Sequence, residues 1–344
     1  MLAQPIAFET EDLFGKEYKF VAFVNGGGNN QLYKIAALDN RYLAAKCYSG
    51  TPADSLERLS REFEALSFLN QHHIASVPQA LFCHHEKRYA LYEWLSGSRI
   101  VDPEIKDIDA TVAFIAELQA LSKLDQAKNL RIAKDAKLSG ASVVEEITWR
   151  LDRLLQLEPK DENLQSFLNK SLMPAIADVI HWSKKIYQQQ NLSFERELAF
   201  AQQTLSPSDF GFHNALRKDD HSISFLDFEY FGWDDPAIML SAFLWHPAMN
   251  LSFDLKQSFV SGAVKVFAED QSFNSRLQAL FPLMGLIWCL IILNEFIPEI
   301  WKRRVASGYY SENEKLGIQL KQLKKSEDYL MNVKNSMEKF PYEM

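Results

Sequence analysis

The sequence has few cysteines, no long hydrophobic run and no excess of basic residues. Its three cysteines, Cys47, Cys83 and Cys289, are far apart and odd in number, so they predict neither a disulfide framework nor a Cys-x-x-Cys metal site. Sparse cysteine is typical of a reducing compartment, and we expect a cytoplasmic protein. A formal net charge of −8 disfavours a nucleic-acid partner, because proteins that bind nucleic acids carry basic patches.

The longest apolar run covers residues 279–293 and is followed directly by Asn294 and Glu295. It is shorter than the roughly 20 residues that cross a bilayer, so we expect a buried helix and no membrane span. The N-terminus, Met-Leu-Ala-Gln-Pro-Ile-Ala, lacks the basic region and apolar core of a signal peptide. Nothing in the sequence indicates an oligomeric state.

The composition provides for a substantial core. Of the 344 residues, 47% are hydrophobic and 24% are charged, which is ordinary for a globular protein. This length accommodates two domains or one domain with two lobes.

The polar residues around which the chain is organised lie in residues 205–237. Asp209 is followed by Asn214 and then by Asp227, and a predicted hairpin over 215–226 would bring the last two together. Asp-x-x-x-x-Asn followed by Asp-Phe-x is the layout of a kinase catalytic loop and metal-binding turn. In such a site Asp209 orients the acceptor hydroxyl and takes its proton. Asn214 and Asp227 hold Mg²⁺ through their oxygens.

The triplet at 209–211, Asp-Phe-Gly, also spells the metal-binding triplet of protein kinases. In that register a catalytic Asp would have to lie upstream, but residues 185–204 contain none. The chain also lacks His-Arg-Asp and Ala-Pro-Glu, and the interval from Asp227 to Pro236 is too short for a long activation segment. We therefore reject this register, and a protein-kinase function is disfavoured.

Three strands are predicted near the N-terminus, at 18–24, 31–38 and 41–48. The turn between the first two is rich in glycine, and glycines let backbone N–H groups approach phosphate oxygens closely. An ordinary hairpin turn is the alternative, but the position of the turn ahead of the third strand favours phosphate binding. The candidate residues in this turn are Gly26, Gly27 and Gly28.

Lys46 lies in the third strand, which is otherwise uncharged over 42–48. A kinase uses a lysine at this place to hold the α- and β-phosphates, and a solvated surface lysine is the alternative. The helix that follows, with Thr51 as its N-cap, should carry the glutamate that orients Lys46. Glu62 falls within the arc of the apolar face, whereas Glu64 falls opposite its centre, so Glu62 is the predicted partner. Surface pairing of both glutamates with nearby arginines is the alternative.

Together these motifs resemble the aminoglycoside phosphotransferase and choline kinase superfamily. That family typically reads His-Gly-Asp-x-x-x-x-Asn, then an apolar strand, Asp-Phe-Asp/Glu and a closing Gly-Asp-Pro-Ala. The matching stretches here are 208–214, 225–229 and 233–237, and the resemblance extends over residues 18–300. One departure is Pro207, which stands where the family has the histidine that supports the loop backbone, and proline cannot donate a hydrogen bond.

The resemblance implies a protein-kinase-like α+β fold with two lobes. Residues 1–97 would form a small β-rich N-terminal lobe that binds nucleotide, and residues 98–344 a larger helical lobe with the catalytic loop and the acceptor site. It also implies ATP or GTP as co-substrate, Mg²⁺ as cofactor and a hinge whose backbone binds the base. The hinge residues would be Glu93, Trp94 and Leu95.

The C-terminal part is predicted to be mainly helical, with a kink or break at Pro298. Apolar residues at spacings of three and four predict helices over residues 110–121, 143–157 and 163–189. Further helices are predicted over residues 239–245, 255–267, 279–295 and 311–338.

We therefore expect a small-molecule kinase that transfers a γ-phosphoryl group to a hydroxyl of a small acceptor. The catalytic loop and residues 288–296 are similar to uncharacterised bacterial members tied to surface-polysaccharide pathways, which implies a sugar or glycan precursor. An aminoglycoside and a choline-like amino alcohol are the alternative acceptors. A nucleotide-binding pseudokinase, acting as a regulator or scaffold, is the second hypothesis, and Pro207 motivates it. The retained Lys46, Asp209, Asn214 and Asp227 argue against it.

Overall fold

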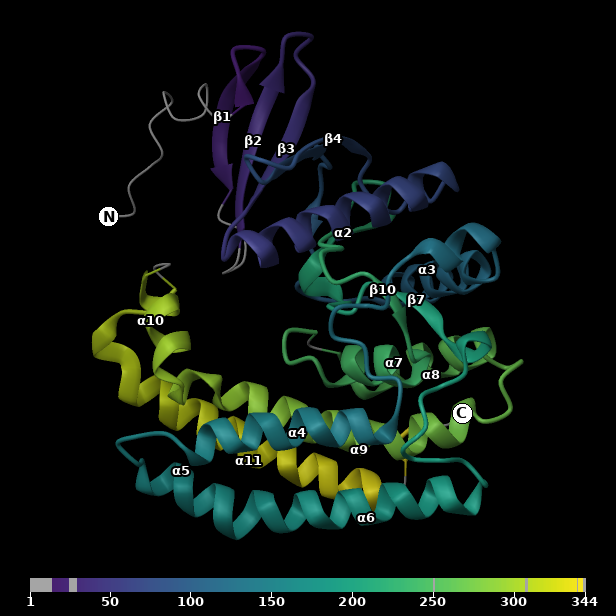
Figure 1. Cartoon of the computed structure of the whole chain (residues 1–344), viewed down its shortest axis with the longest axis vertical. Helices are drawn as coiled ribbons and strands as arrows, with labels where there is room; N and C mark the ends of the chain where they lie inside the picture. Colours follow the sequence, from purple (N-terminus) through teal and green to yellow (C-terminus); the bar gives the residue numbers. More distant parts are fainter. Residues whose placement is uncertain (1–13, 25–29, 250, 307–308, 339, 343–344) are drawn as a thin grey trace. The chain divides into compact units, whose positions relative to one another are not determined.

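The computed structural model describes residues 14–24, 30–249, 251–306, 309–338 and 340–342 (Figure 1). By its internal contacts the chain divides into two units. Unit 1 is Met1–Asp135 with Pro207–Gly232, and unit 2 is Ala136–Ser206 with Trp233–Met344. These boundaries differ from the predicted lobe boundary at residue 97, and the division into lobes stays a prediction.

Unit 1 contains an antiparallel sheet of five strands in the order β1-β2-β3-β5-β4. Side chains of β2, β3 and β5, among them Ile35, Ala45 and Leu91, pack with Phe14 into one core cluster. The first three strands lie where the sequence predicts them, but β4 was not predicted. The strands are β1 (Tyr18–Val24), β2 (Asn30–Ala37), β3 (Tyr42–Tyr48), β4 (Ala80–His84) and β5 (Tyr89–Glu93).

Helix α2 (Pro52–Gln71) packs against β3, β4 and β5. The Thr51 hydroxyl caps it by accepting the N–H of Asp54, and Pro52 occupies a first-turn position where a missing N–H costs nothing. Its buried face includes Leu59 and Glu62. The helical register therefore turns one glutamate of this helix toward the sheet.

The segment 207–232 is anchored in unit 1 by an aromatic cluster around Phe114 of α3 (Ile105–Ser122). Phe114 stacks on Phe225 with ring centroids 4.5 Å apart, and Phe210 and Phe228 lie 6.0 and 6.4 Å from it. Phe210 directly follows Asp209 and Phe228 directly follows Asp227. Because both rings are buried, they fix the backbone on which the two aspartates are carried.

A three-stranded sheet, in the order β6-β8-β9, completes the regular structure of this segment. The predicted hairpin is confirmed as the pair β8–β9, whose register places Ala215 opposite Phe225. The strands are β6 (Ser98–Arg99), β8 (Ala215–Arg217) and β9 (Ile223–Phe225), and short 3₁₀ turns cover Asp125–Asn129 and Phe212–Asn214.

Helix α9 (Phe273–Ile292) is the core of unit 2 and packs against α4, α6, α7 and α11 (Figure 1). Gly285 permits this close packing, because a Cβ there would lie 2.5 Å from Val333 and 2.8 Å from Trp245. The other helices are α4 (Gly140–Leu155), α5 (Glu162–Phe167), α6 (Met173–Gln189), α7 (Pro236–Trp245), α8 (Phe253–Val266), α10 (Pro298–Ala306) and α11 (Lys315–Glu338).

The remaining regular elements are short. A π-helical turn at Leu168–Leu172 interrupts the single helix predicted over 163–189. The chain breaks at Pro298, as the sequence suggests, and a new helix begins there. Strands β7 (Thr204–Ser206) and β10 (Gly232–Asp234) pair with each other, and 3₁₀ turns cover Phe200–Gln202, Leu293–Phe296 and Glu312–Glu314.

The helical stretch Phe273–Phe296 is long and apolar enough, by length and composition alone, to cross a membrane. The predicted apolar run is therefore part of a longer helix, and the length of this helix does not argue against a membrane span. Its burial argues against one, because 78% of the most apolar window of the helix is buried within the protein. We interpret the stretch as a core helix. The three cysteines are all free.

Asp234 is a buried carboxyl group in unit 2. Its Oδ1 accepts hydrogen bonds from the backbone N–H of Lys137, at 3.0 Å, and of Asp235, at 2.8 Å. Burial outweighs these two donors and raises the pKa of Asp234 from an ordinary 3.8 to about 7.

The raised pKa of Asp234 predicts that the free energy of unfolding decreases as the pH rises. The folded protein holds this proton more tightly than the unfolded chain, so its contribution is complete below pH 3.8 and is lost as the pH rises through about 7. Asp234→Asn keeps an oxygen for both N–H groups and carries no charge. We expect it to raise the free energy of unfolding at pH 8 by on the order of 2–4 kcal/mol. Urea denaturation at pH 5 and pH 8 measures the difference, with exposed Asp219→Asn as the control; equal pH dependence in Asp234→Asn and wild type would contradict it.

Candidate active site

Lys46 of β3 lies against Glu62 of α2, the partner that the sequence predicts. The Lys46 ammonium is 2.7 Å from Glu62 Oε2, and the two side chains are 11% and 4% exposed. Glu64 instead points outward, pairs with Arg131 and is 52% exposed. Helical periodicity alone therefore distinguishes the two glutamates.

The Lys46 ammonium also contacts the turn at 227–229. It lies 2.7 Å from Asp227 Oδ1 and 3.6 Å from Glu229 Oε2. One oxygen from each of Glu62, Asp227 and Glu229 lies within 4.8 Å of the others. Burial alone would lower the pKa of Lys46, but these three carboxylates raise it well above its usual value. Lys46 is therefore a cation held by three anions.

Glu62 has hydrogen bonds to both of its carboxylate oxygens. Oε2 accepts from Lys46 and from the Tyr48 hydroxyl at 2.6 Å, and Oε1 accepts from the backbone N–H of Phe228 at 3.3 Å. Burial raises the pKa of Glu62, and Lys46 counteracts the shift. One side chain thereby connects α2, β3 and the turn that carries Asp227.

A second buried ion pair reinforces this turn and was not predicted. Arg58 donates to Glu229 at 3.0 Å, to Asn30 Oδ1 at 2.7 Å and to the backbone carbonyl of Ser49. Asn30 also donates to Glu229 at 2.6 Å. The available signal was the spacing of Arg58, four residues before Glu62 and so on the same face of the helix.

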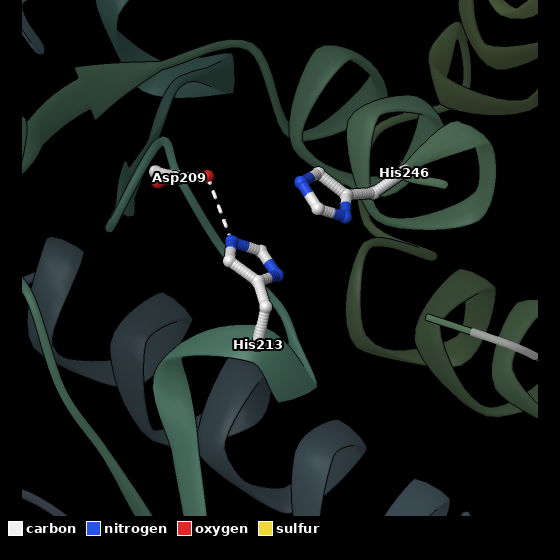
Figure 2. A group of neighbouring side chains, drawn as sticks. All are labelled: Asp209, His213 and His246. Atoms are coloured by element: carbon white, nitrogen blue, oxygen red, sulfur yellow. Dashed lines mark hydrogen bonds and ion pairs between the residues drawn. The ribbon is translucent and has the colours of Figure 1, made fainter. Parts of the chain in front are cut away.

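The catalytic-loop residues Asp209 and Asn214 lie together. The Asn214 side-chain amide donates to the Asp209 backbone carbonyl at 3.0 Å and to Asp209 Oδ2 at 3.2 Å. His213 Nε2 lies 2.9 Å from Asp209 Oδ1 (Figure 2). No role for His213 follows from the sequence, because a histidine in a loop gives no periodic signal.

Two residues beside or at the candidate site have a left-handed backbone, Ser208 with φ +65° and Asp227 with φ +66°. Each lies beside or at a candidate site residue, and non-glycine residues rarely adopt this conformation. The hairpin holds the ends together, because the N–H of Leu226 donates to the carbonyl of Asn214 at 2.8 Å. The backbones of Asn214 and Asp227 are therefore neighbours, as predicted.

The oxygens of Asn214 and Asp227 fit a hard divalent cation. No residue in the described part of the chain donates to Asn214 Oδ1, because its amide nitrogen makes both contacts. Asp227 uses Oδ1 for Lys46, and none of the described residues donates to its Oδ2. An amide oxygen and a carboxylate oxygen on adjacent backbones are the ligand types that Mg²⁺ prefers. Their role as metal ligands stays a prediction.

The predicted hinge follows β5. Glu93 is fixed to Gln79 by a bond from its own N–H to the Gln79 carbonyl at 2.9 Å. Trp94 packs under the Lys34 ammonium, 4.6 Å from the ring centroid. Within the described residues, the backbone of Leu95 has no hydrogen-bond partner, so its N–H and C=O are free for a nucleobase. The predicted phosphate-binding glycines, Gly26 to Gly28, lie outside the described residues.

Truncating Glu62 should destabilise the protein far more than truncating Glu64. Glu62→Ala removes the buried carboxylate that Lys46 and the Tyr48 hydroxyl share, at a cost of about 3 kcal/mol. Glu64→Ala removes an exposed pair and should cost less than about 1 kcal/mol. Urea denaturation of the two variants measures the difference. Equal losses would show that Glu62 does not hold the cluster together.

Comparisons with known proteins agree with this geometry. A family model described as the phosphotransferase enzyme family (APH) matches residues 21–252, which include every candidate site residue named above. No curated protein sequence matches the chain.

Solved structures share the fold. A spectinomycin phosphotransferase, in complex with ADP and spectinomycin, is 14% identical with a TM-score of 0.61, over 96% of this chain and 99% of that one. Plasmodium vivax ethanolamine kinase is 15% identical with a TM-score of 0.56, over 92% and 85%. Choline kinase LicA from Streptococcus pneumoniae is 14% identical with a TM-score of 0.55, over 95% and 98%. The predicted protein-kinase-like α+β fold is confirmed.

Proposed function

The chain belongs to the phosphotransferase enzyme family, and on that premise we propose that it transfers the γ-phosphoryl group of ATP or GTP to a hydroxyl of a small acceptor. The observation that carries the proposal is the contact of the buried Lys46 ammonium with both Glu62 and Asp227, at 2.7 Å each. This contact joins the residue that would hold phosphates to a residue that would hold metal. Such an arrangement serves phosphoryl transfer, in which catalysis is mainly positioning and charge stabilisation.

Lys46 would hold the nucleotide phosphates. Its ammonium is fixed by Glu62, so it enters the reaction already oriented and charged. Asn214 and Asp227 would hold Mg²⁺ through Oδ1 of the amide and through the carboxylate. When bound, this ion neutralises the charge that develops on the phosphates. The free backbone of Leu95 would bind the base.

Asp209 would act on the acceptor. Its side chain is 48% exposed, so a hydroxyl group can reach it. As general base it would orient that hydroxyl and take its proton when the new bond to phosphorus forms. Neighbouring His213 and Asn214 hold the carboxylate in place.

For the acceptor we favour a sugar or glycan precursor. The support is the form of the catalytic loop, 206–214, together with 288–296, which resemble members tied to surface-polysaccharide pathways. The structural neighbours named above act on spectinomycin, ethanolamine and choline, so an aminoglycoside and an amino alcohol are the alternatives. Transfer assays with all three classes decide between them.

A nucleotide-binding pseudokinase is the second candidate, because Pro207 replaces the supporting histidine. Its prediction is nucleotide binding without transfer. Against it, the site keeps Asp209 accessible and held by two side chains, which a regulator does not need.

A cytoplasmic location goes with this function. All three cysteines are free, which is the usual state in a reducing compartment. Fractionation of cells that produce the protein tests the location, and recovery outside the cytoplasm would contradict it.

Asp209→Asn should abolish transfer but keep nucleotide binding. The amide cannot take a proton, so transfer of labelled γ-phosphate to the acceptor should fall by about 100-fold or more. Calorimetric titration with Mg·ATP should give an unchanged dissociation constant. Asp219→Asn, on the exposed hairpin turn, is the matched control. Unchanged transfer in Asp209→Asn would remove Asp209 from its role, and wild-type binding without transfer would favour the pseudokinase.

A further inference from the structure

We propose that His213 is a positioning residue for the reaction, and that it orients the Asp209 carboxylate through a hydrogen bond from Nε2–H. This inference rests on the proposed function. Figure 2 shows the His213 ring pointing at Asp209, and Nε2 lies 2.9 Å from Oδ1. The His213 side chain is 19% exposed and that of Asp209 is 48% exposed. The histidine is therefore the more enclosed of the two, and the carboxylate remains open to an acceptor.

The two oxygens of Asp209 are held by different residues. His213 contacts Oδ1 at 2.9 Å, and the Asn214 amide contacts Oδ2 at 3.2 Å and the Asp209 carbonyl at 3.0 Å. The Asn214 contact to Oδ2 is the longer one, so Oδ2 is the oxygen that an acceptor hydroxyl can engage. A donor on Oδ1 fixes the rotation of the carboxylate.

The chain before Asp209 cannot supply this support in the usual way. Pro207 has no N–H, and its carbonyl accepts the N–H of Asp209 at 2.9 Å. Ser208 takes a left-handed conformation in between, with φ +65°. Downstream of Asp209, His213 and Asn214 both contact the carboxylate, and His213 makes the shorter contact.

The backbone of His213 is rigid enough for the task. It lies in the 3₁₀ turn Phe212–Asn214, which is closed by a bond from the Asn214 N–H to the Gly211 carbonyl at 3.0 Å. Phe210 and Phe212 on either side of that glycine are 4% and 1% exposed. Two buried rings thus fix the turn that returns His213 to Asp209, and a positioning residue needs such support.

His213 neither gives nor takes a proton in the proposed step. The acceptor oxygen forms a bond to the γ-phosphorus of ATP as its proton passes to Asp209. The bond between that phosphorus and the bridging oxygen breaks, and ADP leaves with the electron pair. His213 keeps its Nε2 proton throughout and acts only through Asp209.

Three variants separate this role from simple packing. Glutamine carries an Nε2–H₂ donor at nearly the same distance from the backbone as the histidine Nε2. Asparagine is too short to reach Asp209, and leucine fills the space but has no donor. We expect His213→Asn and His213→Leu to lower kcat by about 10- to 100-fold, with the KM for ATP unchanged. His213→Gln should recover at least half of wild-type kcat. Each variant should keep the melting temperature of wild type within a few degrees.

The assay uses labelled ATP, Mg²⁺ and the best acceptor among sugars, aminoglycosides and amino alcohols. The control is His181→Gln, on the exposed face of α6, which should match wild type. Equal kcat for His213→Leu and wild type would overturn the proposal. So would an equal loss of kcat for Gln, Asn and Leu, because that pattern indicates packing.

A second measurement does not depend on activity. Long-range proton–nitrogen NMR spectra of the protein with ¹⁵N-labelled histidine report which ring nitrogen carries the proton, and the His213 signals are those missing from His213→Gln. We expect a protonated Nε2 in wild type and a shifted Nε2 signal in Asp209→Asn. An unprotonated Nε2 would overturn the proposal. If wild type transfers phosphate to none of the acceptors, the proposed function is wrong. The spectra still test the hydrogen bond between His213 and Asp209 in that case.

Discussion

The ammonium of Lys46 among three carboxylates is the interaction on which the rest of the site depends. It brings β3, α2 and the turn at 227–229 to one point, although Asp227 is 181 residues from Lys46 in the sequence. A lysine buried without anions would lose its charge, and three buried carboxylates without a cation would repel one another. The charges carried by the three elements therefore stabilise one another.

The charges of this cluster also suit its proposed ligands. Lys46 and Arg58 face Glu62, Asp227 and Glu229, so anions exceed cations in the network. The partly exposed member is Asp227, with a side chain that is 35% exposed, whereas Glu62 and Glu229 are 4% and 3% exposed. Of the three carboxylates, that of Asp227 is therefore the one that a metal ion could reach. The buried carboxylates of Glu62 and Glu229 hold the Lys46 ammonium in position, and that of Asp227 is available to a ligand.

Much of this could be predicted from the sequence, because the features involved are periodic or local. Alternation predicted β1 to β3, and the 100° step of a helix distinguished Glu62 from Glu64. The features that were missed give little or no such signal. Arg58 and Glu229 are 171 residues apart, His213 reaches Asp209 through a loop, and β4 has a mixed burial pattern without clean alternation. The π turn at Leu168–Leu172 is a local irregularity within a periodic helix, which sequence periodicity does not resolve.

The most direct test of the central claim is the thermal stability of wild type and Lys46→Met with ATP, with and without Mg²⁺. The account predicts a rise for wild type that requires Mg²⁺ and reaches about 2.7 kcal/mol when ATP is 100 times its dissociation constant. Lys46→Met should show little or no rise. GTP in place of ATP identifies the preferred base. No rise in wild type with either nucleotide would contradict the account, because the cluster around Lys46 would then be structural and no triphosphate site would exist there.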